Sequence, residues 1–397
     1  MHVTPIATSE GLADLSAEWN VLAGGSPLCS WAWLAGWWRH YGQGSKLRVL
    51  AVFDAGQLQA VAPLYGTRSN TQGHVLRFLG SGEVCTDHAT ILCADHCREA
   101  AVEAIAEYLA GPQLDTGWFA SHRDDRWDLL ELTGVDQTDA IVASLVERLQ
   151  QRGCGVHARP GLNCWRLELP DTWEGYLASL SKSHRKQVRR VEQRLLGAGR
   201  AVLHMARTLD ELPTAFATFV DLHQRRRKSL GEPGCFASSR FAAFLPDVAS
   251  DLMAAEKLRL FWLELDGRPV AAEFQMAGDG VVYAYQSGVE PDVLEDQPGR
   301  IITIATLQQA IAEGFREFDF MRGDEPYKAH WRAAPQASVE YRVAAPRTLA
   351  RWRQSAWIAT QNLKQMARQR LRPADHRPPE AEQPEAPTTL ALAVSQR

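Results

Sequence analysis

The stretch from Leu258 to Trp331 constrains the fold more than any other part of the sequence, because strand-like apolar runs alternate in it with turn signals. Leu258 to Leu265 is rich in large apolar residues and predicts a strand buried on at least one face. Asp266-Gly267 follows, which is a hairpin signal because a type I′ turn requires positive φ. Two more strands are expected on either side of a turn at Gly278-Asp-Gly280. The sequence therefore predicts three consecutive strands joined by tight turns.

A helix and a further strand complete this stretch. Apolar residues recur at helical spacing from Ile301 to Ile311, after a polar loop that ends in Gln297-Pro-Gly-Arg300, and Gly314 is suited to the C-cap. Phe315 to Met321 returns to a strand pattern. The start of a helix after a glycine-bearing loop carries free N–H groups and a positive dipole end. We therefore expect this helix start to bind a pyrophosphate.

The order of these elements resembles the GNAT superfamily of acyl-CoA-dependent acyltransferases. The closing run Phe318-Asp-Phe-Met-Arg-Gly-Asp-Glu-Pro-Tyr-Lys328 is similar to the branch called CelD-like, which is associated with cellulose or exopolysaccharide biosynthesis. The resemblance covers about residues 164–343. It implies an α/β (α+β) fold, with a mixed, mostly antiparallel sheet and flanking helices. It also implies acyl-CoA, acetyl or longer, as co-substrate, an amine as acceptor and no metal.

The turn after the last strand of this stretch holds the predicted catalytic residues. We expect Asp324 or Glu325 to accept the proton of an attacking amine, directly or through water. Tyr327 would donate to the leaving thiolate, and Lys328 would hold an anionic group of the acceptor. No Ser-His-Asp or Cys-His grouping is marked in the sequence, which favours direct attack without a covalent intermediate.

Two further sets of residues are predicted to bind the substrates. The cofactor-binding set is Gln286, Ser287, Gln297, Gly299, Arg300 and Ile301. The substrate-binding set is His223, Arg227, Glu273, Gln275, Tyr283 and Tyr285. His223 and Arg227 are spaced i, i+4 on a predicted helix. Glu273 and Gln275, like Tyr283 and Tyr285, lie on the same face of a predicted strand. If the turn is only structural, Glu273 and His223 are the next candidates for the general base.

An internal echo predicts a duplicated fold. Leu47 to Phe53 reads as a strand, and a shift of 211 positions places Leu47 on Leu258 and Gly56 on Gly267. A helix and a strand follow in the same order as in the second half, which favours a tandem arrangement similar to the Fem-type transferases. Before the first-half helix the sequence has Asp95 and no glycine, and an acid at this position repels phosphate. We therefore expect the first repeat to have lost its cofactor site.

These patterns predict four segments. Residues 1–160 form a degenerate GNAT-like domain and residues 161–345 the GNAT acyltransferase domain. Residues 346–372 form a basic amphipathic helix, which either packs on the domain or contacts a membrane or a partner. Residues 373–397 are rich in Pro, Ala, Glu and Thr and predict a disordered tail.

Composition bounds the location and the ligands. No apolar run reaches the roughly 18 residues of a transmembrane helix, and Met1 to Ile6 does not begin a signal peptide. The seven cysteines, an odd number, predict free thiols in a reducing cytoplasm. The residues Cys85, His88, Cys93, His96 and Cys97 suggest zinc, but their spacings differ from those of structural zinc sites, so no metal is expected.

Lys182 to Arg200 contains seven Lys or Arg against one Glu, although the net charge of the chain is −4. This run is either a solvated helix face or a surface for a polyanion, such as CoA phosphates, a lipid phosphate or tRNA. Interleaved aromatic residues for base stacking are absent from it, which disfavours nucleic acid.

The predicted function is acyl-CoA-dependent transfer of an acyl group to an amino group of a sugar, lipid or polysaccharide precursor. The protein would work in the cytoplasm, with peripheral membrane contact and polysaccharide-synthesis machinery as further partners. One alternative is a Fem-like transferase that uses aminoacyl-tRNA, which the tandem fold and the basic run favour. The other is a non-catalytic component of a polysaccharide biosynthesis apparatus, which the single glycine, Gly299, of the phosphate loop favours.

Overall fold

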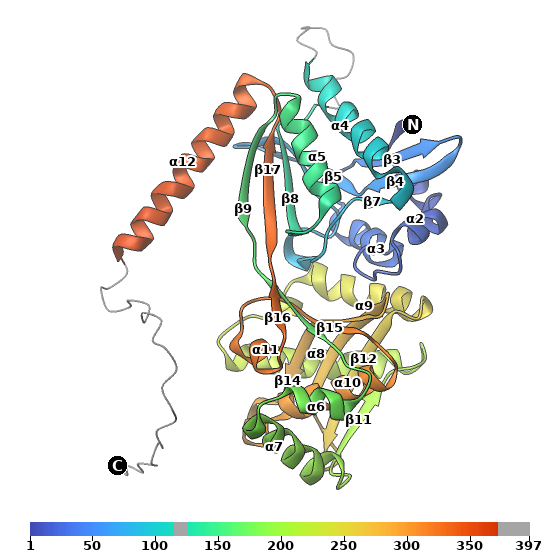
Figure 1. The fold of residues 1–397 in the computed structure, drawn as a ribbon, viewed down its shortest axis with the longest axis vertical. Coiled ribbons are helices and arrows are strands. Elements are labelled where there is room, and N and C mark those ends of the chain that lie inside the picture. Colours follow the sequence, from blue (N-terminus) through green and yellow to red (C-terminus); the bar gives the residue numbers. More distant parts are fainter. Residues whose placement is uncertain (115–125, 372–397) are drawn as a thin grey trace. The chain divides into compact units, whose positions relative to one another are not determined.

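The computed structural model describes residues 1–114 and 126–371, and the predicted tail at 373–397 lies outside them. Residues 1–351 form one unit (Figure 1). The second half of this unit contains a seven-stranded sheet. Its strands, in spatial order, are β11 (Ala201–Met205), β12 (Leu258–Leu265), β13 (Arg268–Gly278), β14 (Val281–Val289), β15 (Glu317–Arg322), β10 (Cys164–Glu168) and β16 (Ala334–Gln336).

The strands of this sheet part in its middle. β14 and β15 are parallel, and the helix α10 (Pro298–Ala312) connects them. Their pairing spans only residues 281–283 and 317–319 and ends at Tyr283 and Asp319. The pairing of β13 with β14 also shifts register between Phe274 and Gln275, which marks a bulge. Beyond these points β14 and β15 are no longer paired, so the sheet opens there.

Helices cover this sheet. The helices of the second half are α6 (Trp173–Ser179), α7 (Lys182–Val191), α8 (Leu212–Ser229), α9 (Ser239–Ala254), α10 and α11 (Pro326–His330). Ten residues of α10 are buried, because the helix packs between the sheet and α6. The α8 helix lies against β14 so closely that a Cβ on Gly288 would meet the backbone N of His223 at 2.2 Å.

The first half repeats this plan with its sheet divided in two. One sheet has the order β1 (His2–Ile6), β3 (Val49–Asp54), β4 (Gln57–Ala62), β7 (Leu92–Cys93). The other has the order β2 (Lys46–Leu47), β5 (Leu64–Ser69), β6 (Gly73–Phe78), β8 (Leu129–Asp136), β17 (Ser338–Ala344), β9 (Gly155–Pro160). Parallel β6 and β8 are joined through α4 (Arg98–Leu114), as α10 joins β14 and β15. The β3–β4 turn lies 211 positions before the β12–β13 turn, so the predicted tandem fold is confirmed.

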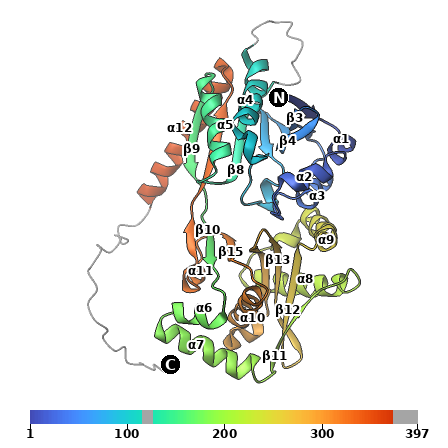
Figure 2. The same ribbon diagram turned by 45° about the vertical axis from the view of Figure 1, so that its right-hand side comes forward.

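Two long strand segments cross both halves. β9 continues into β10 after a short gap, and β16 continues into β17, as Figure 2 shows for the first pair. β10 pairs with β15 and β16 in the second half, whereas β17 pairs with β8 and β9 in the first half. The predicted boundary at residue 345 is therefore wrong for the sheets, because residues 338–344 belong to the sheet of the first half.

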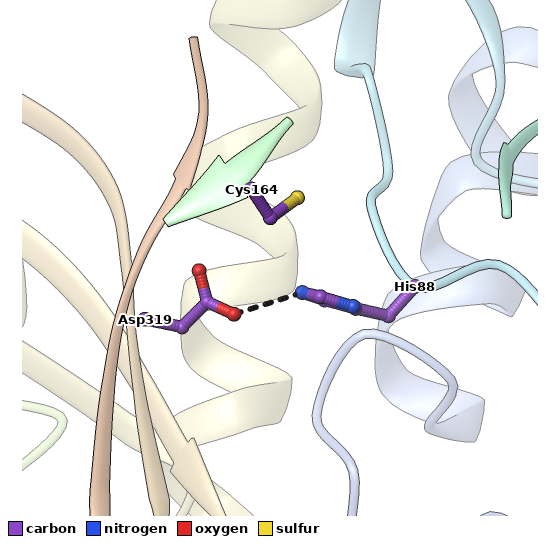
Figure 3. Close-up of side chains that lie close together, drawn as sticks. All are labelled: His88, Cys164 and Asp319. Atoms are coloured by element: carbon purple, nitrogen blue, oxygen red, sulfur yellow. Dashed lines mark hydrogen bonds and ion pairs between the residues drawn. The ribbon is translucent and has the colours of Figure 1, made fainter. Parts of the chain in front are cut away.

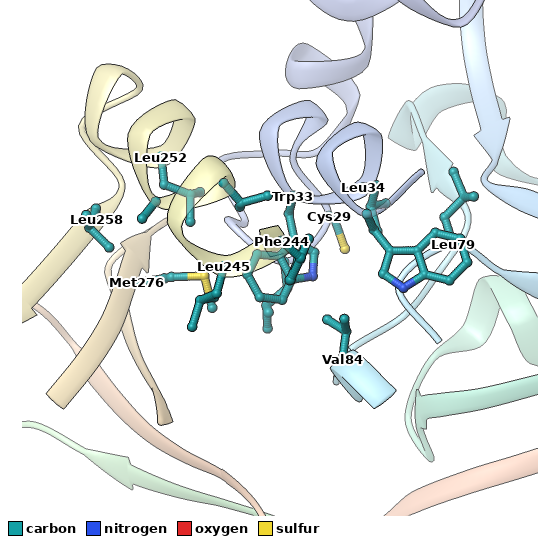
Figure 4. Packing of buried hydrophobic residues seen from close by; sticks show 14 of the residues in the cluster. Cys29, Trp33, Leu34, Leu79, Val84, Phe244, Leu245, Leu252, Leu258 and Met276 are labelled. Atoms are coloured by element: carbon teal, nitrogen blue, oxygen red, sulfur yellow. The ribbon is translucent and has the colours of Figure 1, made fainter. Parts of the chain in front are cut away.

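One apolar core also crosses the halves. The helix α3 (Trp31–Tyr41) packs on α9, and Trp33, Phe244 and Met276 lie in one buried cluster (Figure 4). The helices α1 (Ser9–Ala13) and α2 (Ser16–Leu22) add apolar residues to the same cluster. A Cβ on Gly36 of α3 would meet Val248 Cγ2 of α9 at 2.3 Å, so glycine permits this close packing. The two halves are therefore packed as one body. The remaining helix of the first half is α5 (Ala140–Gln151).

The helix α12 (Thr348–Leu371) begins at the end of this body and belongs mostly to a second unit that starts at Trp352. It agrees with the helix predicted at 346–372. Of the helices in the described ranges, none combines the length and the hydropathy needed to span a bilayer. The seven cysteines are all free, as expected.

Candidate active site

A cleft of about 680 Å³ opens where β14 and β15 part. The residues of β14 from Ala284 to Val289 form one side, and Phe318, Phe320 and Met321 of β15 form another. The start of α10 and the turn after β15 close its ends. The cleft therefore lies at the gap that the sheet topology creates.

The predicted donor side of the cleft comes from β14 and α10. Gln286, Ser287, Gln297, Gly299 and Arg300 all line it. Gln297 has a left-handed backbone with φ of 56°, makes no side-chain cap, and is followed by no acidic residue in the first turn. The Gly299 N–H and the positive end of α10 are therefore available to an anion.

Ile301 differs from the rest of this set. Its side chain is fully buried in a core cluster with Phe261 and Leu263, so it does not line the cleft. Its apolar side chain anchors the first turn of α10 to the sheet. We assign Ile301 this supporting role in place of the predicted contact with the cofactor.

Glu273 is the titratable group in the cleft best suited to accept a proton. It lies on β13 opposite Ser287 of β14, and 9% of its surface is exposed. Its Oε2 accepts a 2.5 Å hydrogen bond from Gln275 Nε2 and a longer one, 3.5 Å, from Thr306 Oγ1. Burial raises the pKa of Glu273 to about 7, although both hydrogen bonds act to lower it. A carboxylate with such a pKa can take up a proton near neutral pH.

The turn after β15 has a structure that revises two of its predicted roles. Lys328 is buried, and its Nζ donates to the carbonyl oxygens of Met321, Arg322 and Gly323 at 3.1, 2.8 and 3.1 Å. It also lies 2.8 Å from a carboxylate oxygen of Glu325. Lys328 lines the cleft, but its donors are used within the turn, so we assign it a structural role in place of the predicted contact with an acceptor anion.

Asp324 also differs from its predicted role as a base. Its Oδ1 accepts hydrogen bonds from Asn163 Nδ2 and Trp165 Nε1, both at 3.1 Å, and the residue is not among those that line the cleft. Glu325 and Tyr327 do line it. Partial burial, together with the nearby carboxylates of Glu325 and Glu273, raises the pKa of Tyr327, so its hydroxyl keeps its proton and can act as a donor.

The predicted substrate-binding residues divide into two groups. Arg227, Glu273 and Tyr285 line the cleft, and Arg227 also forms an ion pair with Glu232. His223, Gln275 and Tyr283 do not line it. The imidazole of His223 contacts Gln224 and Cys235. Gln275 is fully buried beside Glu273, and the ring of Tyr283 packs on His88.

The first half contributes a wall of the cleft that sequence reasoning missed. Glu83, Val84, Cys85 and Asp87 lie in one loop and line the cleft. Arg322 holds this loop: its Nε donates to Asp87 Oδ1 at 2.6 Å and a terminal nitrogen donates to Thr86 O at 3.2 Å. The Tyr285 hydroxyl donates to Val84 O at 2.8 Å. No local motif marks this loop, because its partners lie more than 200 positions away.

An ion-pair network ties this loop to both halves, and Figure 3 shows its pair between His88 and Asp319. His88 Nδ1 lies 2.9 Å from the carboxylate of Asp136 on β8, and its Nε2 lies 3.0 Å from Asp319 Oδ2 on β15. Burial lowers the pKa of His88, but the hydrogen bonds to the two carboxylates outweigh it and hold the pKa well above 6.5. The imidazolium therefore donates to both carboxylates. Arg166 Nε donates to the same oxygen of Asp319 at 3.1 Å.

Cys164 lies beside this network. Within the described ranges, His88, Cys164 and Asp319 form a group that could hold a metal ion, because their ligand atoms all lie within 4.8 Å of one another. It is not the zinc cluster considered from the sequence. Two cationic groups, the imidazolium and the guanidinium of Arg166, already contact Asp319. We therefore assign the group to the ion-pair network between the halves.

Comparison with known proteins agrees with this geometry. Residues 182–329 match the family model described as an acetyltransferase (GNAT) domain, so the second half contains a GNAT domain. No curated protein matches the sequence. A resemblance to the CelD-like branch stays a prediction.

Solved structures show the fold of both halves together. The chain is similar to FemX, with a TM-score of 0.59 and 12% identity over 89% of this chain and 99% of FemX. L-PGS from Bacillus licheniformis follows with a TM-score of 0.51 and 13% identity, over 87% of this chain and 95% of that one. A conserved protein of unknown function from Bacteroides thetaiotaomicron matches with a TM-score of 0.51 and 12% identity, over 86% of this chain and 99% of that one. These likenesses show the shared fold.

Proposed function

We propose that the chain is an acyltransferase that moves an acyl group from acyl-CoA to an amino group, and that the cleft between β14 and β15 is its active site. The observation that carries the proposal is the position of Glu273. Its buried carboxyl, with a pKa raised to about 7, lines the opening of a GNAT-type sheet. The opposite strand β14 is unpaired beyond Tyr283 on its β15 side and presents backbone groups to the cleft.

The proposed reaction is a direct attack. The neutral amine attacks the thioester carbonyl, and Glu273 accepts the amine proton, directly or through a water molecule. Backbone N–H groups of β14 stabilise the oxyanion, and the Tyr327 hydroxyl donates to the departing thiolate. The CoA pyrophosphate lies against Gly299 and Arg300 at the start of α10.

The proposed acceptor is an amino group of a sugar, lipid or polysaccharide precursor. Glu83 from the first-half loop and Glu325 from the turn after β15 both line the cleft. Glu325 is already paired with Lys328, so Glu83 is the carboxylate that we propose attracts a cationic ammonium group. The acceptor would lose its ammonium proton to solvent before the attack, which leaves Glu273 unprotonated for the proton that the amine releases on attack.

Calorimetry and a thiol-release assay test the proposal. The protein should bind acetyl-CoA or a longer acyl-CoA and release free CoA when an amino sugar or an aminolipid is added. Gly299→Asp places a negative charge where the pyrophosphate is expected, so CoA affinity should fall at least tenfold. Gly299→Ala is the matched control, because its Cβ would meet Val289 Cγ1 at an ordinary 3.6 Å. Equal CoA affinity of both variants and the unmodified chain would remove the donor site from α10.

A second candidate is a Fem-like transferase that takes its acyl group from aminoacyl-tRNA. One observation favours it: a hollow of about 630 Å³ on α7 and the following turn is lined by basic side chains. They are Lys182, Arg185, Lys186, Arg189, Arg190 and Arg194. Saturation of the protein by charged tRNA, without binding of any acyl-CoA, would select this function. Binding of neither donor would favour a non-catalytic component.

A further inference from the structure

The helix α12 has a continuous exposed apolar stripe. Leu349, Trp352, Leu363 and Met366 are 56%, 67%, 64% and 49% exposed. Ala356 and Ala359 are exposed between them, so the apolar positions follow a 3-4-3-4-3 spacing. Residues at this spacing lie along one side of a helix over nearly its whole length.

The charges of α12 all have one sign. Between Thr348 and Leu371 the sequence contains Arg351, Arg353, Lys364, Arg368 and Arg370, and no Asp or Glu. Lys364 follows directly after Leu363 of the stripe. A helix with an apolar stripe that includes Trp, and with only cationic charges, has the pattern of a helix that lies in a membrane interface.

From these features we infer that α12 docks on an anionic lipid bilayer, with the stripe inserted between headgroups and the exposed Lys364 against lipid phosphates. The inference is independent of the proposed function. Charge complementarity identifies the occupant, because the sequence of the helix contains only cationic charges and no acid, which suits a negatively charged surface. The helix does not have the hydropathy of a transmembrane segment, so it lies on the surface.

A second copy of the helix fits the stripe less well. The positions that flank the stripe in a coiled coil include Arg353, Ser355, Thr360 and Asn362, which offer no acidic partner for a cation. The middle of the stripe consists of Ala356 and Ala359, whose small side chains would bury little apolar surface between two helices. A bilayer requires neither complementary charges nor interdigitating side chains.

Vesicle sedimentation with the full chain tests the inference. The protein should bind vesicles of phosphatidylcholine and phosphatidylglycerol and should not bind vesicles of phosphatidylcholine alone. Leu363→Gln removes an apolar side chain from the stripe, so partitioning should fall about tenfold or more. Asn362→Gln is the matched control on the adjacent, off-stripe position, and it should partition like the unmodified chain. Lys364→Gln should lower partitioning about fivefold, and a higher salt concentration should also lower partitioning.

Three results would overturn the inference. The first is equal binding of both kinds of vesicle. The second is equal binding of Leu363→Gln and Asn362→Gln, which would also result if the basic face of α7 alone attracted the lipid. The third is a dimer in light scattering without lipid that dissociates in Leu363→Gln, which would show that a second copy covers the stripe.

Discussion

At the scale of single residues, Glu273 determines how activity should depend on pH. A general base works when it is deprotonated, so kcat/KM should rise as the pH increases through about 7, the raised pKa of this carboxyl. Glu273→Gln keeps the shape of the side chain and removes the base. Turnover should fall about 10²- to 10⁴-fold, and the acid limb of the pH profile should disappear. Steady-state kinetics across the pH range measures both effects.

Asp324→Asn is the control for this prediction, because Asp324 does not line the cleft and accepts hydrogen bonds from Asn163 and Trp165. It should retain most of the turnover and the same pH profile. If Asp324→Asn loses the acid limb and Glu273→Gln keeps it, the base lies on the turn after β15 and our assignment is wrong.

Lys328 should matter for stability more than for substrate affinity. Its buried ammonium group holds three carbonyl oxygens of the turn and the exposed carboxylate of Glu325 together. Lys328→Met leaves the three carbonyl oxygens without their donor, and leaving a buried acceptor unsatisfied costs about 1–3 kcal/mol. Chemical denaturation should show this loss in the free energy of unfolding. A variant of normal stability with a raised KM for the acceptor alone would restore the predicted binding role.

At the scale of elements, the contact between α8 and β14 depends on Gly288. A Cβ there would meet the backbone N of His223 at 2.2 Å, and neither the strand nor the helix backbone can move without the other. Gly288→Ala should therefore destabilise the fold by about 1–3 kcal/mol. Because β14 lines the cleft, ligand binding should weaken as well. Thermal unfolding measures the first effect, and Gly299→Ala, whose Cβ has room, should leave the melting temperature nearly unchanged.

The elements differ in how far the sequence could predict them. The strands from Leu258 to Met321 were predictable, because their turns and their apolar period are local properties. The pairing of β17 with β8 joins Ser338 to Asp136, and no local pattern encodes which edge a strand of the second half will join. The same reason explains why the cleft wall at Glu83 to Asp87 was missed. The role of Lys328 was misjudged because spacing shows neither its burial nor the direction of its carbonyl partners.

At the scale of the whole molecule, the His88 network should make stability depend on pH. The pKa of His88 in the folded protein is held well above 6.5, its usual value in an unfolded chain. Its contribution is therefore fully present below about pH 6.5 and is lost as the pH rises through the folded-state pKa. His88→Gln should lower the free energy of unfolding most at acidic pH, and its difference from the unmodified chain should shrink toward alkaline pH.

His96→Gln is the control for this experiment, because His96 is an exposed histidine of the same half. Its free energy of unfolding should follow that of the unmodified chain at every pH. A pH-independent deficit in His88→Gln would mean that packing, and not the imidazolium charge, supports the interface.

The pairing of β17 with the sheet of the first half has a consequence for the order in which the protein can be made. During synthesis the first half emerges before the second, but its six-stranded sheet lacks an inner strand until Ala344 has left the ribosome. Until then β8 and β9 have no strand between them, and their edges are open to wrong partners. The six-stranded sheet of the first half can therefore be completed only after residue 344 of the second half has been synthesised.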